Sequence, residues 1–384
     1  MKTYDIVIVG AGSIGVPAAM ALGEMGIKTA VIDKNPSPGQ GENKHAIGGI
    51  RATHSTPGKI IAGLRSLEIF STWKENHGDD IEWLKGGYLF AVYRKEEEAL
   101  LKGILPIQKE NNLNIDYIDA KKVAEIAPGI NQQGLMGGTF SPDDGSASPL
   151  LAINAFYRKS VSTGNVDFYF NESVTAIRME NRKITGVETD KDKYAAPVVI
   201  DAAGPFSRDL GKLAGLDIPV FPDSHEGAIT EPVKPFFKCM IIDLRPEPGS
   251  KNYYFYQNSH GQIVFCITPD PPILGTDKRE TSVFLPQVSR RMVTLLPRLK
   301  NIRVRRVWRG LYPMTPDGAP LMGWNRDVNG LFHATGMCGQ GFMLGPGLGE
   351  IIARLTTKNE TDNDKMVADE LSLYREFGGE EGLK

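Results

Sequence analysis

The sequence predicts an α/β protein in which a parallel sheet flanked by helices is joined to an α+β domain built on an antiparallel sheet. Three observations predict this class. The chain opens with an apolar strand, a glycine-rich turn, a helix and a second strand, which together form a parallel βαβ unit. The stretch from 220 to 284 is rich in short strands. A length of 384 residues is large for one hydrophobic core, so two domains are expected.

The opening unit carries a dinucleotide-binding fingerprint. Gly10 permits the tight turn, Gly12 lets backbone N–H groups approach a pyrophosphate, and Gly15 lets the helix pack closely on the strand. The helix N-terminus then faces the phosphates with free N–H groups. Asp33 ends the second strand, where it can accept hydrogen bonds from a ribose hydroxyl. The predicted nucleotide contacts are Gly10, Gly12, Ser13, Ile14, Gly15, Asp33 and Lys34.

The uncharged run 6–22 has a second interpretation as the core of a signal peptide. Against it, Asp5 interrupts the approach to the run and Lys2 is the one basic residue before it. Three ordered glycines would also weaken such a helix. Nucleotide binding is therefore the preferred interpretation.

Composition excludes several classes of function. A net charge of −2 gives no general attraction to nucleic acid or to anionic membranes. The basic cluster over 303–309 alternates with apolar residues, which favours a strand with one solvated face over a docking surface. The widely spaced Cys239, Cys266 and Cys338 argue against a disulfide scaffold, a zinc site and an iron–sulfur site. A cysteine-poor chain with no evident transmembrane span is expected in the cytoplasm.

Periodicity predicts the remaining elements. A polar, glycine-rich loop follows the opening unit over 36–49. Helices are predicted over 16–26, 58–77, 149–163 and 348–355 from apolar residues at helical spacing. A further helix with a charged surface is predicted over 95–111. Short alternating runs predict strands over 173–179, 184–189, 198–200, 253–256 and 263–267.

Three later segments separate a flavin from a nicotinamide cofactor. They are Gly48-Gly49-Ile50-Arg51, the stretch 308–323 with Thr315-Pro316-Asp317-Gly318, and the glycine-rich stretch 336–347. Together with the fingerprint they resemble the FAD-dependent D-amino-acid oxidase superfamily. Within it they look most like the group of sarcosine oxidase β-subunits, glycine oxidases and proline dehydrogenase β-subunits. The likeness extends over nearly the whole chain.

The resemblance implies a discontinuous two-domain organisation. A Rossmann-like FAD-binding domain of the glutathione-reductase type is expected over 1–85, 145–215 and 305–384. A substrate-binding or interface domain with an antiparallel sheet is expected over 86–144 and 216–304.

The resemblance also implies how FAD would lie. In this group the cofactor is extended, with its adenosine on the opening unit and its flavin against the segment 48–51. A helix beginning near Pro346 would aim N–H groups at the flavin N1/C2 carbonyl region, where negative charge accumulates on reduction. A flexible turn and helix cap at 339–349 is the plainer alternative, and Val174, aligned with a backbone contact to adenine, is equally a core valine. The further predicted FAD contacts are Gly48, Gly49, Ile50, Val174, Ala203, Gly204, Gly310, Gly339, Gly341, Phe342, Met343 and Leu344.

Departures from the sarcosine oxidases refine the expectation. Gly310 stands where the monomeric enzymes hold flavin through a cysteine, so FAD is expected to bind non-covalently. Met343 stands where they carry a lysine that assists the reaction with oxygen, which favours a dehydrogenase over an oxidase. In heterotetrameric sarcosine oxidase a histidine ahead of the helix near residue 150 attaches FMN covalently, but the corresponding run 142–145 contains no histidine. FMN at a subunit interface stays an open alternative.

The implied chemistry is hydride transfer from the carbon bearing the amine to flavin N5. Arg51 is the first choice to grip a substrate carboxylate, with a role in pinning the loop or FAD as the alternative. Tyr254 is the candidate roof residue over the flavin, and Tyr253 or Tyr256 would replace it in another register. His45 or His225 could assist deprotonation of the amine, although a structural role is the favoured interpretation for each.

We therefore expect an FAD-dependent dehydrogenase or oxidase of a small amino acid or secondary amine, such as proline or sarcosine. It would pass electrons to a partner subunit or acceptor protein. The alternatives are a hydroxy-acid or glycerol-3-phosphate dehydrogenase and a non-catalytic flavoprotein assembly subunit.

Overall fold

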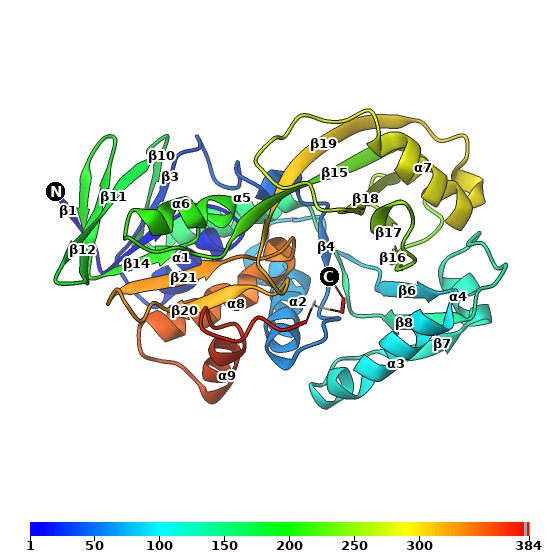
Figure 1. Ribbon diagram of the computed structural model, residues 1–384, viewed down its shortest axis with the longest axis horizontal. Helices are drawn as coiled ribbons and strands as arrows, with labels where there is room; N and C mark the ends of the chain where they lie inside the picture. The colour runs from blue at the N-terminus through cyan, green and yellow to red at the C-terminus, as the bar shows by residue number, and fades with distance from the viewer. Residues whose placement is uncertain (380–381, 384) are drawn as a thin grey trace.

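The structure is a computed structural model that describes residues 1–379, 382 and 383. A four-stranded sheet lies at one end of the molecule and an eight-stranded sheet at the other, with a six-stranded sheet between them (Figure 1). A small three-stranded sheet of β4 (Gly49–Ile50), β9 (Gly145–Ser146) and β5 (Leu84–Lys85) lies near the junction. The mixed α/β class predicted from the sequence is confirmed.

The six-stranded sheet is built around the opening βαβ unit. Five strands run parallel and the last, β20, is antiparallel. Ile6 and Ile8 pack toward the helices, whereas Val7 and Val9 pack toward the four-stranded sheet, as the alternation of side chains along a strand requires. In order, the strands are β10 (Val166–Phe170), β3 (Thr29–Asp33), β2 (Ile6–Val9), β14 (Val198–Asp201), β21 (Leu331–Thr335) and β20 (Leu321–Trp324).

Helices cover one face of this sheet and a meander covers the other. The helices of the covered face share one hydrophobic core and are α1 (Gly15–Glu24), α2 (Pro57–His77), α5 (Pro149–Ser162) and α8 (Gly341–Thr356), with α9 (Asp362–Glu370) against α2 and α8. The four-stranded sheet on the other face consists of β1 (Lys2–Thr3), β13 (Lys193–Ala195), β12 (Lys183–Thr189) and β11 (Val174–Glu180).

The eight-stranded sheet also has two covered faces. Tyr253 and Phe255 lie in the core under α7 (Phe284–Leu295) and α4 (Ala120–Ile126). Tyr88, Phe90 and Ile242 lie on the opposite face, where α3 (Lys95–Glu110) packs at one end. In order, the strands are β19 (Val304–Met314), β15 (Phe221–Pro232), β18 (Gln262–Asp270), β17 (Gly249–Gln257), β16 (Met240–Asp243), β6 (Tyr88–Val92), β8 (Gly137–Ser141) and β7 (Asp116–Asp119).

The strand β19 joins the two halves of the molecule. It begins one residue before the predicted domain boundary at 305, and it pairs along its length with β15 of the eight-stranded sheet. Within the basic cluster, Arg305 and Arg306 are exposed, whereas Arg309 is buried and donates a hydrogen bond to the Arg279 carbonyl at 2.8 Å. The solvated face of this strand therefore does not include Arg309.

Four of the predicted helices are confirmed to within two residues at their ends, and the last one is wrong at its start. The helix α8 begins at Gly341, so Pro346 lies inside it and not at its N-terminus. The glycines around Pro346 favour a helix break locally, but tertiary packing overrides that preference, because α8 crosses α1 where no side chain fits. The helix α7 was not predicted.

The three cysteines are buried and free. Within the described part of the chain, no helix is both long and apolar enough to cross a membrane.

Candidate active site

A cavity of about 850 Å³ lies between the six-stranded and the eight-stranded sheets. Its walls come from segments far apart in the chain: the glycine turn, the segment 41–51, the ends of β10 and β14, the strands β15, β17 and β19, and the start of α8. A cavity of this size is in the range of cofactor and ligand sites. Most of the predicted site residues line it, which brings together parts of the sequence that periodicity could not connect.

The glycine turn forms one end of the cavity. A side chain on Gly15 would overlap the Gly10 carbonyl, so the close packing of helix on strand does require glycine. A side chain on Gly12 would meet no atom within 4 Å, because Gly12 borders the cavity. The turn is thus tight where the protein packs and open where a ligand would approach.

Asp33 fixes this turn from the end of β3. Its Oδ2 accepts a hydrogen bond from the Ala11 N–H at 2.7 Å, and its Oδ1 accepts from the Asn35 N–H at 2.7 Å. Beside it, the Lys34 ammonium lies 3.4 Å from the centroid of the Phe206 ring. Burial lowers the pKa of Lys34. Asp33 and Lys34 line the cavity, together with Val174, Ala203 and Gly204.

Two helix N-termini open onto the cavity. The N-cap residues Ile14 of α1 and Gln340 of α8 make no side-chain capping bond within the described residues, and neither first turn contains an acidic residue. The positive ends of both helix dipoles therefore remain available to a ligand. The amide Nε2 and Oε1 of Gln340 are buried without a partner among the described residues. Gln340 is not among the residues predicted from the sequence, although it lies within the glycine-rich segment.

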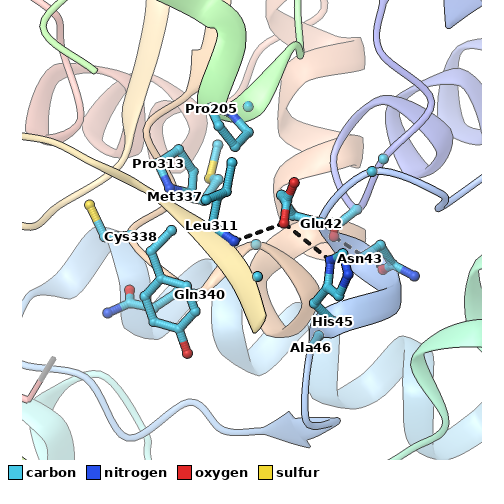
Figure 2. A pocket seen from close by; sticks show the side chains of 18 of the residues that line it. Glu42, Asn43, His45, Ala46, Pro205, Leu311, Pro313, Met337, Cys338 and Gln340 are labelled. Carbon is cyan, nitrogen blue, oxygen red and sulfur yellow. Dashed lines mark hydrogen bonds and ion pairs between the residues drawn. The ribbon is translucent and has the colours of Figure 1, made fainter. Parts of the chain in front are cut away.

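Glu42 connects three walls of the cavity (Figure 2). Its Oε2 accepts hydrogen bonds from the Leu311 N–H at 2.8 Å and pairs with His45 Nδ1 at 3.2 Å, and its Oε1 pairs with Lys278. Burial raises the pKa of Glu42, but the bonds from these partners outweigh burial and hold its pKa below the ordinary value. No periodicity or motif in the sequence pointed to Glu42.

Gly310 lies against the segment that carries His45. A side chain on Gly310 would place its Cβ 2.6 Å from the Cβ of His45, which is too close for any residue but glycine. Both residues line the cavity. The structure therefore gives His45 a neighbour on β19 and a carboxylate partner in Glu42.

Arg51 lines the cavity, but its guanidinium is engaged with the main chain. It donates hydrogen bonds to the carbonyls of Thr53 and Leu383, and the residue is 6% exposed. These bonds favour the alternative interpretation, in which Arg51 pins the loop. The adjacent Asp144 accepts from the Ala52 N–H at 3.0 Å and from Thr53 Oγ1 at 2.6 Å.

Side chains alternate between the two faces of β17, and this alternation decides which of its tyrosines faces the cavity. Tyr254 faces the cavity, whereas Tyr253 is fully buried in the core under α7. Tyr256 is buried and donates to the Ile47 carbonyl at 2.6 Å. The hydroxyl of Tyr254 lies 2.9 Å from that of Tyr312 on β19, so these two residues form one polar group on the cavity wall.

Some predicted contacts do not line the cavity. Ile50 and Leu344 have fully buried side chains within the core shared by α1, α2 and α8, and Gly15 packs under the turn. By contrast, the remaining members of the two glycine-rich segments line the cavity: Gly48, Gly49, Gly339, Gly341, Phe342 and Met343.

The residues present fit an extended FAD. The open side of Gly12 and the uncapped start of α1 provide N–H groups where a pyrophosphate would bind. Beside the glycine turn, the uncapped start of α8 and the unpaired amide of Gln340 provide donors and an acceptor for the edge of a flavin.

Comparison with known proteins supports the same assignment. A solved structure of L-proline dehydrogenase from P. horikoshii is 29% identical with a TM-score of 0.91, covering 97% of this chain and 98% of that chain. Glycine oxidase from Geobacillus kaustophilus is 23% identical with a TM-score of 0.85, covering 98% of this chain and 100% of that chain.

Relatives by sequence include two sarcosine-metabolising proteins. The sarcosine oxidase subunit beta of Rhodobacter capsulatus is 23% identical over 97% of this chain and 89% of its own length. Mitochondrial sarcosine dehydrogenase of Mus musculus is 22% identical over 94% of this chain, which spans only 40% of that relative. The family described as FAD-dependent oxidoreductase (DAO) matches residues 5–355. The chain therefore belongs to the DAO family of FAD-dependent oxidoreductases.

Proposed function

We propose that this FAD-dependent oxidoreductase oxidises a small amino acid or secondary amine, with proline or sarcosine as the favoured substrates, to the imine. The observation that carries the proposal is the cavity itself, which extends from the glycine turn to the Tyr254–Tyr312 pair. The pair lies at the end of the cavity that adjoins the start of α8, where the flavin would sit. The similarity to L-proline dehydrogenase over nearly the whole of both chains supports this substrate class.

The chemistry that FAD would supply when bound is a hydride acceptor at its N5 atom. The protein's share of the reaction is to bind and orient the substrate. The Tyr254 hydroxyl and the Tyr312 ring would close the pocket over the reacting carbon. Arg51 stays our candidate for the substrate carboxylate, with loop pinning as the competing role, and His45 would act through its pair with Glu42.

The electron acceptor is proposed to be a partner subunit or acceptor protein and not oxygen. Met343 lines the cavity at the start of α8 and brings no positive charge to it. A developing superoxide beside the flavin would lack the stabilisation that a cation gives. The similarity to a sarcosine oxidase subunit supports assembly with a partner, and the free cysteines agree with the reducing environment of the cytoplasm.

The decisive experiment is anaerobic bleaching of the flavin. The purified chain is reconstituted with FAD and mixed without oxygen with proline, sarcosine, glycine, D-amino acids and hydroxy acids, while the visible spectrum is followed. We expect secondary amines to bleach the flavin and an artificial dye to reoxidise it faster than oxygen does.

Other outcomes would point to the alternatives. Bleaching by hydroxy acids alone would replace the amine by a hydroxy acid as substrate. A yellow protein that none of these compounds bleaches would indicate an assembly subunit.

A further inference from the structure

His225 lies on β15 directly opposite Gly310 of β19, with its ring in the cavity wall. It is 6% exposed, and its Nε2 lies 3.0 Å from Oδ2 of Asp223. Asp223 is itself held in place, because its Oδ1 accepts from the Ile273 N–H at 2.6 Å. A carboxylate at Nε2 keeps the hydrogen of a neutral imidazole on that nitrogen, which leaves a lone pair on Nδ1.

The Nδ1 atom of His225 is buried and has no partner among the described residues. A buried polar atom without a partner is costly, and at the wall of a binding cavity the missing partner is expected on the ligand. The other cavity histidine differs in this respect, because Nδ1 of His45 already pairs with Glu42 at 3.2 Å. The structure thus distinguishes two histidines that the sequence left equivalent.

The surroundings of His225 suit a group that gains a positive charge. The Tyr312 ring stacks on the imidazole with 3.8 Å between centroids and 12° between planes. Burial raises the pKa of Tyr312 and of Tyr254 well above the ordinary value, so both phenols stay neutral. The other titratable groups that face His225 are Asp223 on its own strand, Cys266 on β18, and Glu42 with His45 over Gly310.

We propose that His225 is a catalytic residue that accepts the ammonium proton of the substrate on Nδ1, while Asp223 is the positioning residue that orients the ring. This inference rests on the proposed amine oxidation. The N–H bond of the substrate ammonium breaks and an Nδ1–H bond forms, so that the substrate nitrogen keeps an electron pair. That pair forms the C=N bond as the C–H bond breaks and its hydride passes to FAD. The imidazolium is stabilised by the Asp223 carboxylate.

The test compares His225→Gln and Asp223→Asn with His260→Gln as the matched control. His260 is an exposed histidine paired with Glu82 at 2.8 Å, outside the cavity wall. Bound FAD and the thermal transition of each variant check folding. The rate of anaerobic flavin reduction by proline and by sarcosine is then measured at saturation from pH 6 to pH 10.

We expect His225→Gln to lower the rate at pH 7 by about 10²-fold or more, the usual contribution of a positioned base. The variant must use substrate that is already neutral, so its rate should rise about tenfold per pH unit until the substrate amine titrates. Asp223→Asn should lower the rate by about tenfold or more, because the amide no longer keeps the hydrogen of the His225 imidazole on Nε2 and Nδ1 is then not free to accept a proton. His260→Gln should react like the unaltered protein.

A second measurement does not depend on turnover. Nitrogen spectra of FAD-loaded protein labelled with ¹⁵N-histidine should show the His225 imidazole protonated at Nε2 and bare at Nδ1, and Asp223→Asn should change this pattern. A reduction rate in His225→Gln that equals that of the unaltered protein, or one lowered by the same factor at every pH, would overturn the role. If no amine bleaches the unaltered protein, the amine function fails and the role falls with it.

Discussion

At the scale of single residues, Met343 is the side chain on which the proposed electron acceptor rests. It lies in the first turn of α8, lines the cavity and packs partly against the core of the six-stranded sheet. Its thioether fills space beside the flavin site without bringing a charge. In the proposed function, the choice between oxygen and a protein acceptor would thus depend on this uncharged side chain.

Replacing Met343 by lysine should accelerate the reaction of the reduced flavin with oxygen. A cation at this position stabilises the charge that develops on oxygen, and one preorganised electrostatic contact of this kind is worth about 10²-fold in rate. The measurement is stopped-flow reoxidation after anaerobic reduction with dithionite, with Met343→Gln as the uncharged control. Equal reoxidation rates in the two variants would contradict the argument.

Asp144 should make the stability of the protein depend on pH. Burial raises its pKa to about 6, although hydrogen bonds from Thr53 and Ala52 and the charge of Arg51 oppose the rise. Between pH 4 and pH 6 the folded protein therefore binds a proton that the unfolded chain releases, so stability falls as pH rises through this range. The expected loss is about 3 kcal/mol, and it is complete above pH 6.

The variant Asp144→Asn removes this titration and keeps an oxygen to accept the Ala52 N–H. Urea unfolding at pH 4, 5, 6 and 7 should show the variant gaining about 2–3 kcal/mol relative to the unaltered protein across the range. All other carboxyl groups are the same in the two proteins, so their titration cancels when the two free energies of unfolding are subtracted. A constant difference at every pH would show that Asp144 does not titrate there.

At the scale of elements, the position of α8 is set by where it can approach α1. A side chain on Gly345 would overlap the Ser13 carbonyl in the glycine turn, and one on Gly349 would lie 2.7 Å from the carbonyl carbon of Pro17. Both clashes are with backbone, which cannot move without displacing the turn. The start of α8 and the glycine turn are therefore held together as two walls of one site.

Gly345→Ala should separate these two elements. We expect it to lower the free energy of unfolding by about 1–3 kcal/mol and to weaken FAD binding, because the added methyl group pushes α8 from the turn. Gly103→Ala is the matched control, since Gly103 lies inside α3 with open space around it and the change should stabilise the helix by about 0.5–1 kcal/mol. Urea unfolding and flavin absorbance after gel filtration measure both effects.

At the scale of the whole molecule, the cavity joins two halves with separate cores. The six-stranded sheet packs under α1, α2, α5 and α8, whereas the eight-stranded sheet packs under α4 and α7. The two meet at the cavity, where β19 and the pair formed by Lys278 and Glu42 link them. A ligand that contacts both walls therefore stabilises the relation between the two halves.

FAD should protect both halves at once. Binding to the folded state alone contributes about 2.7 kcal/mol when free FAD is a hundredfold above its dissociation constant. Hydrogen exchange should then slow in the glycine turn and also in β15 and β19, whereas ADP should slow exchange in the turn alone. If FAD slowed hydrogen exchange in the first 33 residues alone, the cofactor would not extend between the two sheets.

Features that depend on near neighbours could be predicted from the amino-acid sequence. The glycine turn with Asp33 predicted the nucleotide end of the site, and helical periodicity predicted α2, α3 and α5, because both signals depend on residues within a few turns of one another. The later glycine-rich segments added the family, and with it FAD. These inferences needed no knowledge of which strands are neighbours.

The residues at the proposed reacting end became apparent from the folded chain alone. Three residues that meet at the cavity come from different kinds of element: Glu42 from a loop, His225 from an antiparallel strand and Gln340 from the start of a helix. Whether a histidine has a free nitrogen, or an arginine such as Arg51 is already bound to main-chain carbonyls, depends on spatial neighbours that include residues as distant in the chain as Leu383. Hydrogen bonds and burial act over a few ångströms in space, so a linear pattern can name such residues but cannot assign their partners.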